Sequence, residues 1–335
     1  MLKKAYDVSR GALRWARRAG NAVRRAPTEL QAGARAPAEL PQHIGHLESL
    51  PHRLEPSPTE GPAPAPGTTF PLDYPVRPRP RWGYGRPEHR PLRAILDSRR
   101  DAYAALLGKF LPLRDELWRI PCEPDERAPT APAWVNPWFA GLDAVALYGL
   151  VATTKPKRYL EIGSGHSTKF ARRAIADHRL DTTVTSIDPA PRAEIDSICD
   201  RLVRLPVEDV ELNIFDELES GDILFVDNSH RVLMNSDATT VFLDVLPRLR
   251  PGVLVHFHDV FLPADYPPQW AERFYSEQYL LAAYLIAEWP RLEVLLPNAF
   301  VSADAALLEV IEPLWRAPQM RGVRRLGLSF WLAMR

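Results

Sequence analysis

Short apolar runs alternate with amphipathic stretches over the second half of the chain, and this alternation predicts the fold. The apolar runs have the length of buried strands and occur at residues 158–162, 183–188, 201–207, 222–227 and 252–259. Helical patterns lie between them, for example at 167–178 and 236–249. Apolar strands separated by helices form a parallel sheet, because right-handed crossovers place the helices against its two faces.

The flanks of this region extend the prediction. Helical patterns cover residues 141–154 and roughly 268–288, and two further apolar runs follow at 291–297 and 326–334. We interpret these last two runs as strands of a hairpin, joined through a loop and turn segment. The sequence therefore predicts an α/β domain over residues 155–335, Rossmann-like and doubly wound, with a mostly parallel seven-stranded sheet.

The first part of the chain divides into three segments by composition. Eight of the first 25 residues are Lys or Arg and one is acidic, and apolar positions recur near one helical face, so residues 1–26 are predicted to form a basic amphipathic helix. Residues 27–80 contain 13 prolines and are predicted to be a disordered linker, because such a segment buries too little apolar surface to fold. Helical spacing then predicts an N-terminal extension or lid over 81–154.

Charge and cysteine content narrow the class of protein. The 42 basic and 42 acidic residues balance overall, so the chain beyond the basic N-terminus is net acidic, and nucleic acid is not an expected partner. Two cysteines cannot build a disulfide framework, and no apolar run reaches the roughly 20 residues of a membrane span, which indicates a cytoplasmic protein. Residues 1–25 either contact the inner membrane surface peripherally or form a solvated basic tail.

Acidic side chains follow each of the five apolar strands. In a doubly wound sheet the carboxyl ends of the strands face the ligand, so these side chains are predicted to meet at one edge. They are Glu161, Asp188, Glu208 with Asp209, Asp227, and Asp259 beside His258. Five acidic strand ends in succession indicate a binding site more strongly than any one of them does.

A glycine turn follows the first strand. Gly163 and Gly165 allow a close approach of the backbone to a ligand, and Ser167 or Thr168 can cap the following helix. The dinucleotide fingerprint requires a third small residue where Thr168 stands, so the NAD signature is broken. Glu161 suits a ligand with a cationic amino group, and Asp188 is placed to bind a ribose diol.

The segments LEIGSGHST, SIDP, DILFVDNSH and LRPGVLVHFHDVFLPADYP together resemble class I S-adenosylmethionine-dependent methyltransferases of the methyltransferase domain 24 family, over roughly 134–335. This resemblance implies the contacts of the cofactor. Its methionine part would be surrounded by Glu161, Gly163, Ser164 and Gly165, its ribose held by Asp188, and its adenine placed near Glu208 or Asp209. Ser167 is also expected to bind the cofactor.

The spacing of Asp227 and His230 is similar to that of metal-dependent O-methyltransferases that act on catechols and macrolide sugars. In those families the aspartate after the fourth strand binds the metal, and a basic residue three positions later is the general base. The resemblance thus implies that His230 is the base and that Asp227 and Asp259 are ligands of a Mg²⁺ ion. The alternatives are that His230 only caps the next segment and Asp259 only bonds its loop. His258 is a ligand, a second base or a core histidine.

The predicted function is O-methylation of a hydroxyl on a sugar, a glycan or another small molecule, with S-adenosylmethionine as cofactor. One alternative is an NAD-dependent oxidoreductase or nucleotide-sugar enzyme on a similar sheet. Another is a non-catalytic interaction module that keeps the methyltransferase fold, since a fold alone does not fix a function.

Overall fold

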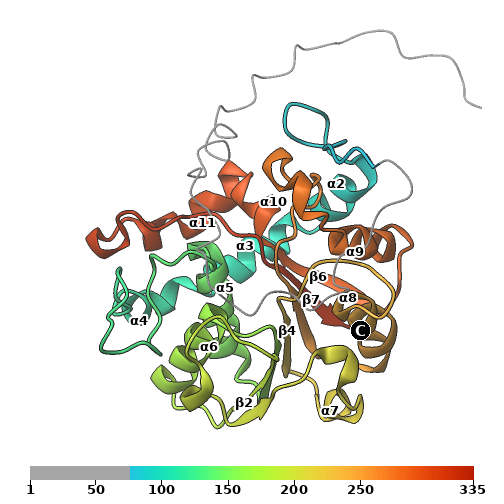
Figure 1. Ribbon diagram of the computed structural model, residues 1–335. Helices are drawn as coiled ribbons and strands as arrows, with labels where there is room; N and C mark the ends of the chain where they lie inside the picture. Colours follow the sequence, from blue (N-terminus) through green and yellow to red (C-terminus); the bar gives the residue numbers. More distant parts are fainter. Residues whose placement is uncertain (1–75) are drawn as a thin grey trace, which may run out of the picture. The chain divides into compact units, whose positions relative to one another are not determined.

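The computed structural model describes residues 76–335 (Figure 1). The predicted basic helix at 1–26 and the predicted linker, up to residue 75, lie outside the described residues. One sheet with helices on both of its faces organises the described part of the chain (Figure 1). No helix in that part is long and apolar enough to cross a membrane.

The sheet has seven strands in the order β3-β2-β1-β4-β5-β7-β6. The first five pair in parallel, and β7 lies antiparallel between β5 and β6. The fold prediction is therefore confirmed. The strands are β1 (Arg158–Ile162), β2 (Thr183–Ile187), β3 (Arg201–Val203), β4 (Ile223–Val226), β5 (Leu254–Phe257), β6 (Leu292–Pro297) and β7 (Phe330–Met334).

The helices of the core lie on both faces of the sheet: α5 and α6 pack together on one face, and α8 and α9 lie on the other (Figure 1). The α-helices are α2 (Arg90–Asp97), α3 (Arg100–Gly108), α4 (Arg114–Leu117), α5 (Gly141–Thr154), α6 (His166–Asp177), α7 (Asn213–Asp216), α8 (Asp237–Thr240), α9 (Glu277–Ile286), α10 (Asn298–Ser302) and α11 (Ala305–Trp315). The first four lie within the predicted N-terminal extension, residues 81–154. Their apolar side chains enter the same buried cluster as the sheet, so this extension shares the hydrophobic core.

Two sequence expectations need correction. The segment between β6 and β7 is not a loop and turn, because it contains α10 and α11. Helix α11 follows Asp304, whose side chain accepts hydrogen bonds from two backbone N–H groups of its first turn, and it buries one apolar face. Pro313 lies inside this helix, and because an internal proline usually ends a helix, the sequence pattern did not indicate one here. The helix expected over 268–288 is interrupted, since a 3₁₀ helix (Pro268–Arg273) ends at Phe274 with φ +53° and α9 begins only at Glu277.

Helix α5 is buried along nearly its whole length, between the sheet and the rest of the N-terminal extension. The extension packs closely on it: a Cβ atom on Gly149 would lie 2.3 Å from ring carbon Cδ1 of Phe110. The absence of a side chain at position 149 therefore sets the distance between the extension and the helix.

We expect Gly149→Ala to lower the free energy of unfolding by about 1–3 kcal/mol, because overpacking a buried contact outweighs the gain in helix propensity. Gly108→Ala is the matched control, since nothing lies within 4 Å of a Cβ built at the end of α3, and it should leave stability unchanged or raise it by up to about 1 kcal/mol. Denaturant unfolding of both variants checks this. Equal stabilities would show that Phe110 does not limit the packing.

Candidate functional site

A cleft of about 460 Å³ opens at the carboxyl ends of the parallel strands. It brings together most of the residues selected from the sequence, although they come from five different strand ends. Those that line it are Gly163, Ser164, Gly165, Ser167, Asp188, Glu208, Asp227, His230, His258 and Asp259. Trp138 and Phe139, from the segment before α5, also line it. Glu161 and Asp209 are not among its lining residues.

The glycine turn between β1 and α6 forms one wall of the cleft. Gly163 has φ +79°, and a Cβ there would lie 1.7 Å from the carbonyl oxygen of Asp227, so no other residue fits. The next backbone amide, of Ser164, donates to Asp188 Oδ2 at 2.8 Å. Gly165 borders open space, with nothing within 4 Å of a Cβ built on it. The turn thus presents bare backbone to the cleft.

Glu161 lies behind this turn and does not line the cleft, so its predicted contact with the cofactor stays a prediction. Its buried carboxyl group accepts hydrogen bonds from Ser167 Oγ and, at 2.5 Å, from Thr168 Oγ1. Burial raises the pKa of Glu161 to about 8, and this effect outweighs the hydrogen bonds from the two hydroxyl groups, which lower the pKa. The side chain therefore anchors the first turn of α6, and Thr168, where a third glycine was missing, is one of its partners.

Two acidic side chains define the half of the cleft near β2 and β3. The carboxylate of Asp188 is held by backbone, since Oδ1 accepts from Ala190 N and Oδ2 from Ser164 N, both at 2.8 Å. Glu208 has a buried oxygen, Oε2, that finds no partner among the described residues. A buried acceptor without a donor is costly, so this atom is suited to a hydrogen-bond donor of a ligand. The neighbouring Asp209 is exposed and does not line the cleft, so Glu208 is the only one of the two residues predicted for the adenine that does.

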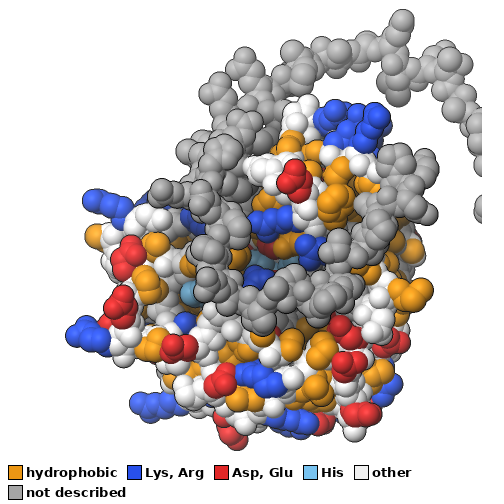
Figure 2. Space-filling view, in the orientation of Figure 1, with side chains coloured by type: hydrophobic (Ala, Val, Ile, Leu, Met, Phe, Trp, Pro, Cys, Tyr) orange, Lys and Arg blue, Asp and Glu red, His pale blue; other side chains and the backbone are white. Residues whose placement is uncertain are grey.

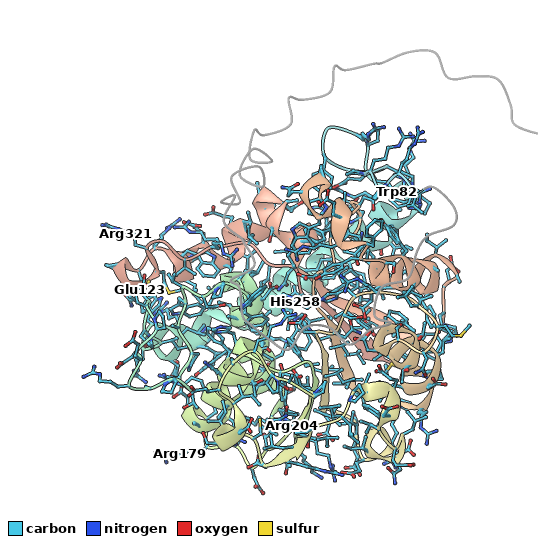
Figure 3. All side chains as sticks on the ribbon, in the orientation of Figure 1. Trp82, Glu123, Arg179, Arg204, His258 and Arg321 are labelled. Carbon is cyan, nitrogen blue, oxygen red and sulfur yellow. The ribbon has the colours of Figure 1, made fainter. Side chains whose placement is uncertain are left out.

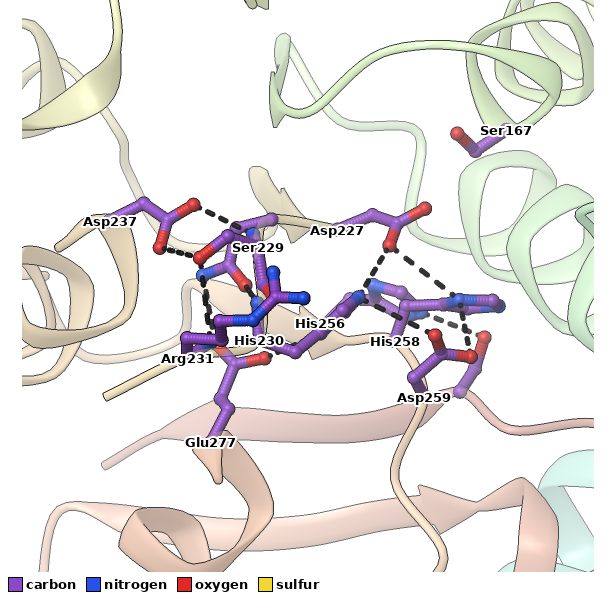
Figure 4. Close-up of polar contacts among 12 residues, drawn as sticks. Ser167, Asp227, Ser229, His230, Arg231, Asp237, His256, His258, Asp259 and Glu277 are labelled. Atoms are coloured by element: carbon purple, nitrogen blue, oxygen red, sulfur yellow. Dashed lines mark hydrogen bonds and ion pairs between the residues drawn. The ribbon is translucent and has the colours of Figure 1, made fainter. Parts of the chain in front are cut away.

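His230 lies at the floor of the cleft, almost fully buried among three carboxylates (Figure 4). Its Nδ1 is 2.9 Å from Glu277 Oε2, and its Nε2 is 3.3 Å from Asp227 Oδ1 and 3.5 Å from Asp259 Oδ2. Burial alone would lower the pKa of His230, but the hydrogen bonds to Asp227 and Glu277 and the charge of Asp259 outweigh it and raise the pKa well above the ordinary value.

A second imidazole, His258, continues the floor. It lies in the interior of the domain (Figure 3), 3.3 Å from Asp259 Oδ1 through Nδ1 and 3.5 Å from Asp143 Oδ2 through Nε2. Burial opposes its charge, yet Asp227, Asp259 and Asp143 raise its pKa well above the usual range. His256, two residues earlier, differs: burial and the charge of His258 lower its pKa. His258 is thus a charged partner of carboxylates, whereas His256 is a neutral core histidine.

The predicted Mg²⁺ site does not fit this arrangement. Asp227 and Asp259 contact the same two imidazoles, and the nitrogens of His230 and His258 lie beside the carboxylate oxygens that a metal would need. Protonated imidazoles and a hard cation compete for the same ligands. Among residues 76–335 there is also no group of three His, Cys, Asp or Glu side chains placed to hold a metal ion.

Two residues of the floor were missed in the sequence. Glu277 appears there as one polar residue of an expected long helix, and only the break before α9 brings its carboxylate to His230. Asp143 appears as a helix position in α5, yet it is fully buried and accepts from the backbone amides of Leu328 and Ser329. An acidic residue inside an otherwise apolar helix was the available signal for Asp143. Nothing in the local sequence marked Glu277.

The pKa of Glu161 predicts a measurable effect on stability. The folded protein keeps the carboxyl proton from pH 4.5 to about 8, where the unfolded chain loses it, so folding stability falls as pH rises through this window. We expect Glu161→Gln to remove that component, which amounts to about 1.4 kcal/mol per pH unit within the window. Unfolding free energies of the wild type and the variant between pH 5 and 8 check it. If the unfolding free energies of the wild type and Glu161→Gln change with pH in the same way, the pKa of Glu161 is not raised.

Comparison with known proteins gives one family. Residues 160–260 match a family model described as a methyltransferase domain. Among solved structures the chain is similar to an SAH-bound methyltransferase of Podospora anserina, with 17% identity over 57% of this chain and 77% of that chain and a TM-score of 0.36. It is similar to an O-methyltransferase of Bacillus cereus in complex with SAH, with 17% identity over 69% and 90% and a TM-score of 0.31. No curated protein sequence matches the chain.

A third similar structure is the O-methyltransferase TomG of Streptomyces achromogenes, involved in tomaymycin synthesis, in complex with SAM, with 18% identity over 64% of this chain and 91% of that chain and a TM-score of 0.34. The sheet order with its antiparallel β7 differs from the order 3-2-1-4-5-6 of dinucleotide-binding folds. The family match begins within β1 and ends just after β5, so it covers the strands that form the cleft. Residues 160–260, which hold the parallel strands of the cleft, thus match a methyltransferase domain.

Proposed function

We propose that the protein is an O-methyltransferase in which His230 is the general base for a hydroxyl acceptor. The arrangement of His230 carries this proposal. One ring nitrogen is held by Glu277 at 2.9 Å, and the other faces the cleft beside Asp227. This is the geometry of a positioned base with an orienting carboxylate behind it.

The half of the cleft near β2 and β3 suits S-adenosylmethionine. The unpartnered oxygen of Glu208 would accept from the amino group of the adenine, Asp188 would bind the ribose hydroxyls, and the turn of Gly163 to Gly165 would lie along the methionine part. When bound, the cofactor supplies a methyl group on a sulfonium. The carboxylates of the floor outnumber the two charged imidazoles, which favours a cationic ligand.

The carboxylates around His230 determine its strength as a base. A hydroxyl is a very weak acid, so a base with a raised pKa removes its proton more readily. Glu277 and Asp227 stabilise the imidazolium that forms when Nε2 takes the proton. The same shift means that His230 is charged in the free protein below its raised pKa, and a charged imidazole accepts no proton. Turnover therefore requires a pH at which Nε2 is free.

The two alternatives from the sequence are less well supported. An NAD-dependent enzyme would need a third small residue at position 168, but Thr168 stands there and its hydroxyl group donates a hydrogen bond to Glu161. A non-catalytic module would not need a buried His230, whose backbone is held at φ +58°, a costly conformation for a non-glycine residue that is typical of functional sites.

Cofactor binding is the first test. We expect calorimetry to detect S-adenosylmethionine binding and no NAD binding by the full chain. Glu208→Ala should weaken S-adenosylmethionine about tenfold, because it removes the buried acceptor. Asp209→Ala is the matched control, since Asp209 is exposed outside the cleft, and it should bind normally. Preference for NAD would overturn the cofactor half of the proposal, and a normal Glu208→Ala would remove Glu208 from it.

His230→Ala should leave S-adenosylmethionine affinity nearly unchanged and lower turnover by about 10² or more, the usual loss for a general base. In the wild type the rate should rise with pH through an apparent pKa above 6.5, because His230 must lose its proton first. Rates of transfer from labelled cofactor to a panel of hydroxylated acceptors, measured from pH 6 to 9, check both points.

The control for that experiment is His178→Ala, which changes a histidine at the end of α6, outside the cleft. It should leave both the rate and its pH dependence unchanged. If His230→Ala keeps the same rising limb as the wild type, another group takes the proton and the proposed role of His230 is wrong.

A further inference from the structure

Four arginines line the cleft, although its floor is acidic: Arg192, Arg231, Arg273 and Arg324. Figure 2 shows Lys and Arg side chains gathered around a hollow in which histidine is visible. Many other arginines of the described chain form ion pairs with Asp or Glu, for example Arg93, Arg172 and Arg248. Among residues 76–335 the four cleft arginines have no carboxylate within ion-pair distance, so their charge remains available to a ligand.

Arg231 and Arg273 form a pair on the side of the cleft that holds His230. Arg231 Nε donates to the backbone oxygen of Arg273 at 3.1 Å. Both guanidinium groups lie over the ring of Tyr275, with Cζ 5.4 and 5.6 Å from its centroid. The ring of His230 lies 4.7 Å from the same Tyr275 ring. A single aromatic side chain therefore separates the base from two cationic groups.

Aromatic contacts hold these guanidinium groups in place. Arg273 Cζ lies 4.0 Å above the ring of Trp270, which meets Tyr275 edge to face at 5.7 Å. Stacking on an aromatic face fixes the plane of a guanidinium and leaves its N–H groups free to bind. The planar fork of Arg matches phosphate and carboxylate groups, to which it donates two parallel hydrogen bonds. Trp270 and Phe261 also line the cleft and offer apolar faces to a ring.

From this arrangement we infer that the methyl acceptor carries an anionic group, a phosphate or a carboxylate, which binds Arg231 and Arg273 while its hydroxyl reaches His230. The inference rests on the proposed function, because it names the chemistry of the acceptor at that same site. Most of the acidic groups lie deeper than these two arginines: the side chains of Asp143, Glu277 and Asp259 are 0, 2 and 14% exposed, and only Asp227 reaches 35%. Arg231 is exposed and Arg273 half-buried.

The carboxylate of the cofactor is the competing partner for these arginines. It would lie with the methionine part along the turn of Gly163 to Gly165, whereas Arg231 follows His230 directly and Arg273 belongs to the 3₁₀ helix before α9. The two arginines are thus placed on the acceptor side, beyond the base. Binding of SAH, which carries the same carboxylate, separates the two roles experimentally.

The test is calorimetry on the full chain saturated with SAH, titrated with glucose 6-phosphate, glucuronate, glucose and inorganic phosphate. We expect the anionic sugars to bind saturably and glucose to bind at least about tenfold more weakly. The phosphate and carboxylate arms show which anion the site prefers. In Arg231→Ala/Arg273→Ala, affinity for the preferred anion should fall about tenfold for each arginine, with SAH affinity unchanged. The anion affinity of Arg231→Lys/Arg273→Lys should lie between those of the wild type and the double alanine variant, because lysine keeps the positive charge but lacks the planar guanidinium that donates two parallel hydrogen bonds.

The charge-matched control is Arg250→Ala/Arg316→Ala, which removes two exposed arginines outside the cleft and should change nothing. Equal binding of glucose and glucose 6-phosphate, or unchanged anion binding by Arg231→Ala/Arg273→Ala, overturns the inference. Loss of SAH affinity in that variant also overturns it, because the arginines would then serve the cofactor. If the wild type binds no SAH, the proposed function fails, while titration with inorganic phosphate alone still tests the arginines.

Discussion

The pairing of buried carboxylates with two imidazoles is the interaction on which the cleft depends. Asp143 and Glu277 are almost fully buried, Asp259 is 14% exposed and Asp227 is 35% exposed. A fully buried carboxylate without a partner would cost several kcal/mol, and His230 and His258 distribute positive charge among the four. The network joins α5, the ends of β4 and β5, and the start of α9. Removing either imidazole would leave a buried carboxylate, Glu277 or Asp143, without its cationic partner, so the four elements are held together at the carboxyl edge of the sheet.

Backbone conformation supports the same arrangement. His230 and Asp259 are non-glycine residues with φ +58° and +54°, each of which costs about 1–3 kcal/mol. The strain at His230 is held by neighbouring hydrogen bonds, since its carbonyl oxygen accepts from the amides of Ser276 and Glu277. The start of α9 therefore fixes both the backbone of His230 and, through Glu277, the direction of its ring. One break between two helices thereby positions the proposed base.

The sequence predicts the sheet well, because its strands are short apolar runs bounded by turns and their carboxyl ends lie at one edge. Most of the site residues that it selects, from Gly163 to Asp259, line the cleft. Prediction from the sequence fails for features that depend on tertiary contacts. The role of Glu161 depends on which way its side chain faces, Glu277 depends on an interruption at Phe274, and α11 depends on burial of a stripe that contains a proline. None of these is encoded within a local window of residues.

Opposite charges at different depths of the cleft favour one orientation of the two substrates over the reverse. The acidic floor favours a cation, and the arginines nearer the solvent favour an anion, so a cationic donor and an anionic acceptor would each be repelled from the place of the other. Repulsion of the wrong arrangement contributes to specificity as much as attraction of the right one. Because methyl transfer requires donor and acceptor to be aligned, this separation of charge supplies orientation before any contact with the reacting hydroxyl is made. The side chains that bind the donor and the acceptor would then also determine where each lies relative to the other, and His230 lies between the acidic floor and the two arginines.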